Sequence, residues 1–231
     1  MALTEHYFTK FTENKFYHVY YRSIDKKPMF YKDGNYEFFL KKYHEYLSPV
    51  IDTYAYNLLG NHFHLLVGIR SGEDLTTFNN LQIQKSSHSK LSNLETKKNK
   101  PIYQDAGKTS HEIVSHQFQK FFQSYAMAFN KQQNRIGTLF QTPYKRVLVE
   151  NDAYFVKLIQ YIHTNAELHG MVKDFRDWKW SSYHSFLIEK ETKLKKQEVL
   201  NWYGSKNKFE VCHLEKKELR NEWRIFLGDD I

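Results

Sequence analysis

Two apolar runs that meet at Gly60 limit the possible folds more than any other feature of the chain. Residues 51–59 and 61–67 are rich in Tyr, Leu, Val and Phe, and only Gly60 separates them. Short runs of this composition favour strands. A connection this short joins antiparallel strands, because parallel strands need a long crossover. The chain is therefore expected to contain an antiparallel sheet with a tight hairpin.

The segments around this hairpin alternate between strand-like and helix-like patterns. Strand-like residues fill 16–24 and 138–149, although Pro143 implies an edge position or a bulge in the second segment. Apolar residues recur at helical spacing in three segments, which are 36–49, 111–133 and 152–170. The resulting order, β-α-β-β-α-β-α, predicts an α+β fold with a ferredoxin-like or RRM-like antiparallel sheet, helices on one side, and a helix after the last strand.

Two segments differ from the rest in composition. Residues 71–110 are dominated by Ser, Asn, Lys, Gln and Thr and lack the apolar surface that repays ordering, so we expect a long, mobile insertion. The chain after residue 190 is charged, with helical patterns around Val199 and over 219–226. We expect a main domain over 1–187 and a charged helical C-terminal extension over 188–231.

Charge and cysteine content narrow the class of protein. The 231 residues carry a formal net charge of +8, which indicates an anionic partner, either nucleic acid or an anionic membrane surface. No apolar run approaches the ~20 residues needed to span a bilayer, and the first residues lack the pattern of a signal peptide. The single cysteine, Cys212, excludes an internal disulfide framework and a Cys-based zinc site. An intracellular protein that binds nucleic acid is the leading class.

His62 and His64 carry the first chemical signal. They lie two residues apart in a strand-like run, so both imidazoles point to one face while Phe63 points to the other. Two neutral imidazoles side by side form half of a divalent-metal site. The alternative is that two histidines fell on the solvent face of a half-buried strand.

Tyr161 and Asn165 carry the second signal. They lie four residues apart in a predicted helix and so project from one face. Asn165 could complete a metal site begun by the histidines, and Tyr161 would then lie beside a phosphate polarised by the metal. A phenol is a poor nucleophile at neutral pH, and a nearby cation favours the phenolate. The alternative for Tyr161 is simple packing, because the chain holds 17 tyrosines.

Together these motifs resemble a known family. The chain is similar to the single-tyrosine HUH transposases, most closely to their REP-associated tyrosine transposase branch. The resemblance spans roughly residues 16–187. It rests on these segments in order: Tyr17-His18-Val19, Met29-Phe30, His62-Phe63-His64, Gly137-Thr138-Leu139-Phe140-Gln141, Tyr161-Ile162-His163-Thr164-Asn165 and Trp180-Ser181-Ser182-Tyr183.

The resemblance implies a reaction and a site. It makes His62, His64 and Asn165 the ligands of Mg²⁺ or Mn²⁺, and Tyr161 the nucleophile. It also implies single-stranded DNA with hairpin or palindromic elements as substrate, a 5′-phosphotyrosine intermediate with a free 3′-OH, and a bacterial cytoplasmic location at the nucleoid when DNA is bound. Related enzymes can exchange the tyrosine helix within dimers, so a homodimer and action in cis or in trans are both open.

The sequence departs from the family pattern in three places. The tyrosine helix ends in residues 165–170, Asn-Ala-Glu-Leu-His-Gly, where the family often has Asn-Pro-Val-Arg-Ala-Gly. The insertion over 71–110 is longer than usual. Pro143 stands where an arginine is common, and Lys145 and Arg146 could replace its charge. None of these changes touches the proposed chemical residues.

Basic side chains around the last strand are candidate phosphate contacts. Arg135, Lys145 and Arg146 are assigned this role, although a solvated face is the ordinary position of a single basic residue. His163 points away from Tyr161 along the helix, and we expect it to pack or to lie on the surface. A lone histidine on the first strand, His18, usually belongs to the core or to a hydrogen bond.

Two other functions remain open at this point. One is a protein that recognises hairpin DNA or RNA without chemistry. The other is a metal-dependent phosphodiesterase that uses water, with Tyr161 only structural. The transposase and the phosphodiesterase differ in whether protein becomes covalently joined to DNA.

Overall fold

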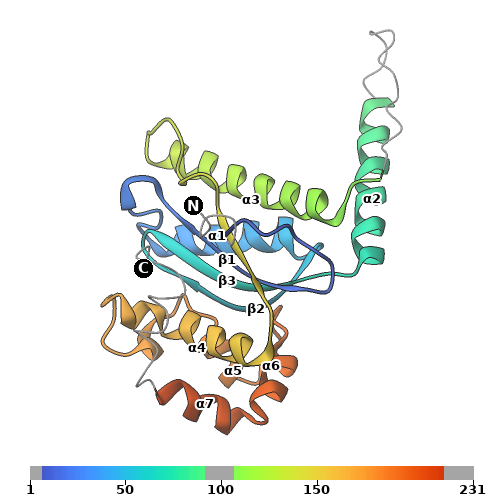
Figure 1. Ribbon diagram of the computed structural model, residues 1–231. Helices are drawn as coiled ribbons and strands as arrows, with labels where there is room; N and C mark the ends of the chain where they lie inside the picture. Colours follow the sequence, from blue (N-terminus) through green and yellow to red (C-terminus); the bar gives the residue numbers. More distant parts are fainter. Residues whose placement is uncertain (1–6, 92–106, 216–231) are drawn as a thin grey trace.

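The computed structural model describes residues 7–91 and 107–215 and shows an α+β fold (Figure 1). Four antiparallel strands form one sheet in the order β2-β3-β1-β4, the order of a ferredoxin-like β-α-β-β-α-β unit. The strands are β1 (Phe16–Arg22), β2 (Ile51–Leu58), β3 (His62–Ile69) and β4 (Lys145–Val149). The helices are α1 (Asp33–Leu47), α2 (Gly72–Leu91), α3 (Ser110–Gln132), α4 (Asp152–Leu168), α5 (Tyr183–Leu187), α6 (Lys196–Tyr203) and α7 (Lys206–Leu214), with short 3-10 turns at Ile24–Lys26 and Phe175–Asp177.

The predicted hairpin is present. Strands β2 and β3 pair antiparallel, and the backbone N–H of Leu59 donates to the carbonyl of His62 at 2.8 Å. The central strand β1 pairs with β3 on one side and with β4 on the other. The antiparallel α+β prediction is therefore confirmed.

Each face of the sheet has its own hydrophobic core. On one face, Val19 and Phe63 pack with α1 and α3 in a core built largely of aromatic rings. On the other face, Leu66 and Val147 pack with α4 and the C-terminal helices. Figure 1 shows these two helical layers above and below the sheet. Helices α1 and α3 lie together on one side of the sheet, as predicted. The tyrosine-bearing helix α4, which follows the last strand, covers the other face with its own apolar residues.

The segment expected to be a mobile insertion begins as the helix α2. A helix satisfies its backbone hydrogen bonds within its own segment, so a polar segment can form one with little buried surface. Leu75, buried near the start of α2, anchors it to the core, and α2 then projects away from the sheet (Figure 1). Residues 92–106, the rest of the expected insertion, lie outside the described residues.

Strand β4 is shorter than the sequence suggested. The ladder begins at Lys145 instead of Thr138, and only a bridge between Ser23 and Phe140 precedes it. Pro143 has no backbone N–H to donate to a strand ladder. Gly137 has a φ of 94°, which bends the chain at the start of the predicted strand. Regular pairing therefore begins only after Pro143.

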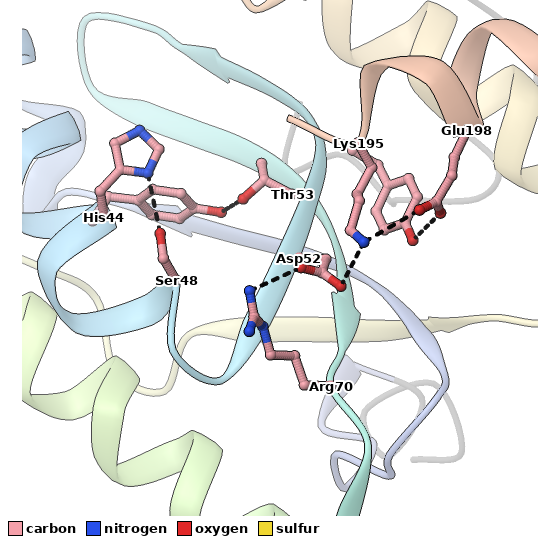
Figure 2. Close-up of polar contacts among 9 residues, drawn as sticks. His44, Ser48, Asp52, Thr53, Arg70, Lys195 and Glu198 are labelled. Carbon is pink, nitrogen blue, oxygen red and sulfur yellow. Dashed lines mark hydrogen bonds and ion pairs between the residues drawn. The ribbon is translucent and has the colours of Figure 1, made fainter. Parts of the chain in front are cut away.

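Helices α6 and α7 pack against the main fold. Val199 and Phe209 are fully buried in the same core as Phe155 of α4. At the start of α6, the ammonium of Lys195 lies 3.3 Å from Asp52 of β2, which also binds Arg70 at 3.2 Å (Figure 2). The helical pattern around Val199 is confirmed, and the one over 219–226 lies outside the described residues. None of the described helices has the length and apolar character needed to cross a membrane.

Candidate active site

The four residues predicted to carry chemistry lie together in the structure. Strand β3 presents His62 and His64 toward α4, and their ring centres are 5.2 Å apart. Helix α4 places the ring of Tyr161 5.4 Å from that of His64. Asn165 follows one turn later, and all four side chains are buried. Residues about a hundred positions apart in the sequence therefore form one cluster within a single chain.

The packing of α4 explains why this cluster forms. Phe155, Leu158 and Ile159 are fully buried against the sheet, which fixes the side of the helix that faces β3. Asn57 of β2, also fully buried, donates from Nδ2 to the carbonyl of Ile162 at 2.7 Å. This hydrogen bond joins the sheet to the middle of the tyrosine helix, and the sequence interpretation did not foresee it.

Each histidine of the pair is hydrogen-bonded through Nδ1. His62 Nδ1 lies 2.7 Å from Oδ1 of Asn61, and His64 Nδ1 lies 3.0 Å from Nε2 of His18. Both Nε2 atoms are buried without a hydrogen bond of ordinary geometry to any described residue, and so is the carboxamide of Asn165. The Asn165 side chain nevertheless lies close enough to His62 and Tyr161 to act on the pKa of each.

Burial keeps both histidines neutral. It holds the pKa of His62 and of His64 well below the usual value, and the nearby charges of His169 and Arg22 lower them further. Burial also lowers the pKa of His18 to about 3. Neutral imidazole is the form that binds a metal ion.

The phenol of Tyr161 is protonated in this environment. Burial raises its pKa, while Asn165 and the guanidinium of Arg22 partly oppose the increase. A bound cation would oppose it more strongly, because a cation favours the phenolate.

The donors of this cluster are of kinds that bind divalent metal ions. A carboxamide oxygen suits Mg²⁺ or Mn²⁺, whereas imidazole nitrogens are ligands more typical of Zn²⁺, Cu²⁺, Fe²⁺ or Ni²⁺. The two Nε2 atoms and the carboxamide of Asn165 are buried in the same cluster. In the part of the chain that the structure describes, no group of three or more His, Cys, Asp or Glu side chains could hold a metal ion. A metal site at this cluster would therefore need the Asn165 side chain as its third ligand.

Arg22 belongs to this site and was missed from the sequence. It pairs with His62 across β1 and β3, on the same sheet face as His18 and Tyr20. Arg22 is half-buried, and among the described residues no hydrogen bond or ion pair engages its guanidinium. The alternation of His18, Tyr20 and Arg22 along β1 is the signal that could have identified it.

The three predicted phosphate contacts are divided between different surfaces. Lys145 pairs with Tyr20 and faces the site, with its ammonium 4.9 Å from the ring centre of Tyr7. Arg146 points to the other face and donates to the carbonyl of Thr9 at 2.8 Å. Arg135 is held in the turn after α3, where it donates to Asn130 Oδ1 at 2.9 Å.

His163 packs in the second core, as expected. Its Nδ1 lies 2.9 Å from Nε2 of His213, and its Nε2 lies 2.8 Å from the hydroxyl of Ser182. All three side chains are buried and join α4 to α5 and α7.

Comparison with protein families and with curated proteins finds no match. Among solved structures, the chain is similar to a REP-associated tyrosine transposase bound to a REP hairpin. The match has 12% sequence identity and a TM-score of 0.49, and it covers 78% of this chain and 82% of that one. A likeness at this level concerns the fold alone, and the family assignment made from the motifs stays a prediction.

Proposed function

We propose that the chain is a metal-dependent enzyme that cleaves and rejoins single-stranded DNA near hairpin elements through a 5′-phosphotyrosine on Tyr161. The observation that supports this most is the cluster of Tyr161, two neutral histidines and Asn165. Simple packing does not require two imidazole nitrogens and a carboxamide to be buried without ordinary hydrogen bonds.

In the proposed reaction, the phenolic oxygen of Tyr161 attacks phosphorus while the bond to the 3′-oxygen breaks. The phenol loses its proton to solvent and the departing 3′-oxygen gains one, so there is no net change in protons or electrons. His62 Nε2, His64 Nε2 and the Asn165 oxygen would hold Mg²⁺ or Mn²⁺, which when bound would neutralise charge on the phosphate oxygens. The phosphotyrosine ester conserves the energy of the broken phosphodiester, so attack by a 3′-OH can rejoin the strand.

Arg22 and Lys145 are the proposed phosphate-binding residues at this site. Both lie on the sheet face that carries the histidines. Their positive charges suit a DNA strand that passes along β1 and β4 toward Tyr161. Arg135 and Arg146 lie away from the site, so a contact between them and DNA is a separate proposal.

The cluster is closed in this conformation. Tyr161 is fully buried, so a phosphate can reach it only after part of the surrounding structure moves. The same burial, with the raised pKa of the phenol, favours a second candidate function, a phosphodiesterase that uses water and keeps Tyr161 as a structural residue.

One experiment separates these functions. The protein is incubated with Mn²⁺ and end-labelled single-stranded DNA that contains a hairpin, and the products are run on a denaturing gel. If the protein is a transposase, the DNA label should migrate at the mass of the protein for wild type. It should also do so for the control Tyr31→Phe, which changes an exposed tyrosine, but not for Tyr161→Phe. Free cleavage products that persist with Tyr161→Phe would establish the water-dependent phosphodiesterase instead. DNA binding without any cleavage would favour the non-catalytic hairpin-binding protein.

The active unit is proposed to be a bacterial cytoplasmic protein that acts in cis. Tyr161 lies beside the histidines of its own chain, so a homodimer would not be needed to complete the site. A dimer remains a separate proposal that sedimentation with and without DNA can test.

A further inference from the structure

Asn61 forms a directed hydrogen-bonded link that ends at His62. Its Nδ2 donates to the carbonyl of Lys26 at 2.9 Å. This bond orients the carboxamide, because the opposite orientation would bring Oδ1 against another carbonyl oxygen. Oδ1 therefore faces His62 Nδ1 at 2.7 Å and can only accept. The proton of neutral His62 must lie on Nδ1, which leaves the lone pair of Nε2 facing the site.

His18 stands in the same relation to His64. Its Nε2 lies 3.0 Å from His64 Nδ1, and both rings are buried. When His18 accepts this hydrogen bond, the proton of His64 lies on Nδ1 and its Nε2 can bind a cation. When His18 donates instead, His64 Nε2 carries the proton and cannot act as a ligand.

From this geometry we propose that Asn61 and His18 are positioning residues that hold His62 and His64 in the tautomer that binds a divalent cation through Nε2. The inference rests on the proposed function and deepens it. The two links differ in whether they fix the tautomer without a metal. Asn61 can only accept from His62, so it fixes the Nδ1–H tautomer of His62 before any cation binds. His18 can accept or donate, and it adopts the accepting form when a cation occupies His64 Nε2.

Asn61 is the better position for a test, because its side chain is only partly buried and its backbone lies in the hairpin turn. Asn61→Ala removes both ends of the link. Asn61→Asp keeps an acceptor for His62 Nδ1–H, but it loses the donor to Lys26 and adds a negative charge. Asn207→Ala, at an exposed position on α7, is the matched control.

The first measurement needs no metal. In metal-free, ¹⁵N-labelled protein, two-bond ¹H–¹⁵N correlations report which ring nitrogen of each histidine carries the proton. We expect the Nδ1–H form of His62 in wild type, Asn61→Asp and the control, and a substantial Nε2–H fraction in Asn61→Ala. His62 in the same tautomer in wild type and Asn61→Ala would overturn the proposal.

The second measurement is Mn²⁺ affinity, followed by the electron paramagnetic resonance of the free ion. Loss of a group that orients a ligand typically weakens metal binding about 10- to 100-fold. We expect a loss of this size with Asn61→Ala, recovery with Asn61→Asp, and a loss with His18→Ala. Equal affinity of wild type and Asn61→Ala overturns this inference alone. If wild type does not bind Mn²⁺ at all, the proposed metal-dependent function fails with it.

Discussion

The buried histidines predict steep acid unfolding of the metal-free protein. Five histidines are buried and have lowered pKa values, namely His18, His62, His64, His163 and His213. In the unfolded chain each would titrate near 6.5. Between that value and the lower folded pKa, the unfolded state binds more protons, so stability falls as the pH falls.

The magnitude follows from proton linkage. Relative to pH 7.5, each such histidine costs about 1.4 kcal/mol at pH 5.5 and about 2 kcal/mol at pH 5, if it stays neutral in the fold. All five together cost about 7 kcal/mol at pH 5.5, which is comparable with the total stability of a typical domain, about 5–15 kcal/mol. We therefore expect unfolding between about pH 5 and pH 6.

The assay is urea unfolding, followed by tryptophan fluorescence in EDTA at a series of pH values. The slope of unfolding free energy against pH between 6 and 5.5 gives the number of protons taken up, expected to be about four. His18→Gln should lower this number by about one. Uptake of fewer than about one proton in wild type would refute the assignment of neutral, buried histidines to the fold.

Three further predictions test separate parts of the structure. Phe155→Ala, at a fully buried position where α4 meets the sheet, should destabilise the protein by about 3–5 kcal/mol in urea unfolding, and a loss below about 1 kcal/mol would contradict the packing. Arg22→Gln should slow formation of the covalent DNA adduct while Mn²⁺ affinity stays within about twofold, and unchanged adduct kinetics would exclude Arg22 as a phosphate contact. Lys145→Gln should lower the slope of log affinity against log salt for single-stranded DNA by about 0.7, whereas Arg135→Gln should leave it unchanged because Asn130 and Thr138 already engage that guanidinium.

The sequence predicted the sheet and the central residues of the site because both depend on short, regular spacings. Residues two apart on a strand and four apart on a helix share a face wherever those elements lie, so His62 with His64 and Tyr161 with Asn165 could be paired. That the two pairs would meet followed from the family resemblance and the order of the elements. The structure brings them together, and their roles stay proposals.

Other features depend on contacts between distant segments, which periodicity does not reveal. Arg22 enters the site through its register with β3, and the role of Asn61 depends on the position of the Lys26 carbonyl. The polar composition of α2 suggested a mobile segment. A solvated helix needs only one or two buried anchors such as Leu75, so composition alone does not distinguish it from a mobile segment. Helices α1, α3 and α4 all carry apolar faces that must be covered. Their composition alone did not show which face of the sheet each helix packs against.

The cores on the two sheet faces also differ in how well their buried polar groups are hydrogen-bonded. This difference affects the free energy of unfolding and bears on function. One core is built largely of aromatic and aliphatic side chains, and the buried hydroxyls of Tyr43 and Tyr125 within it have hydrogen-bond partners in Thr53 and the carbonyl of Met29. The other buries His62 Nε2, His64 Nε2 and the carboxamide of Asn165 without ordinary hydrogen bonds to described residues. Each such group costs about 1–3 kcal/mol, so together they lower stability by several kcal/mol that apolar side chains of similar size would avoid. A ligand that engages all three at once would offset that cost, and a divalent cation is the simplest ligand that does so. Binding of Mn²⁺ should therefore raise the urea midpoint of wild type, and should do so far less for His64→Gln, where one of the three donors is replaced.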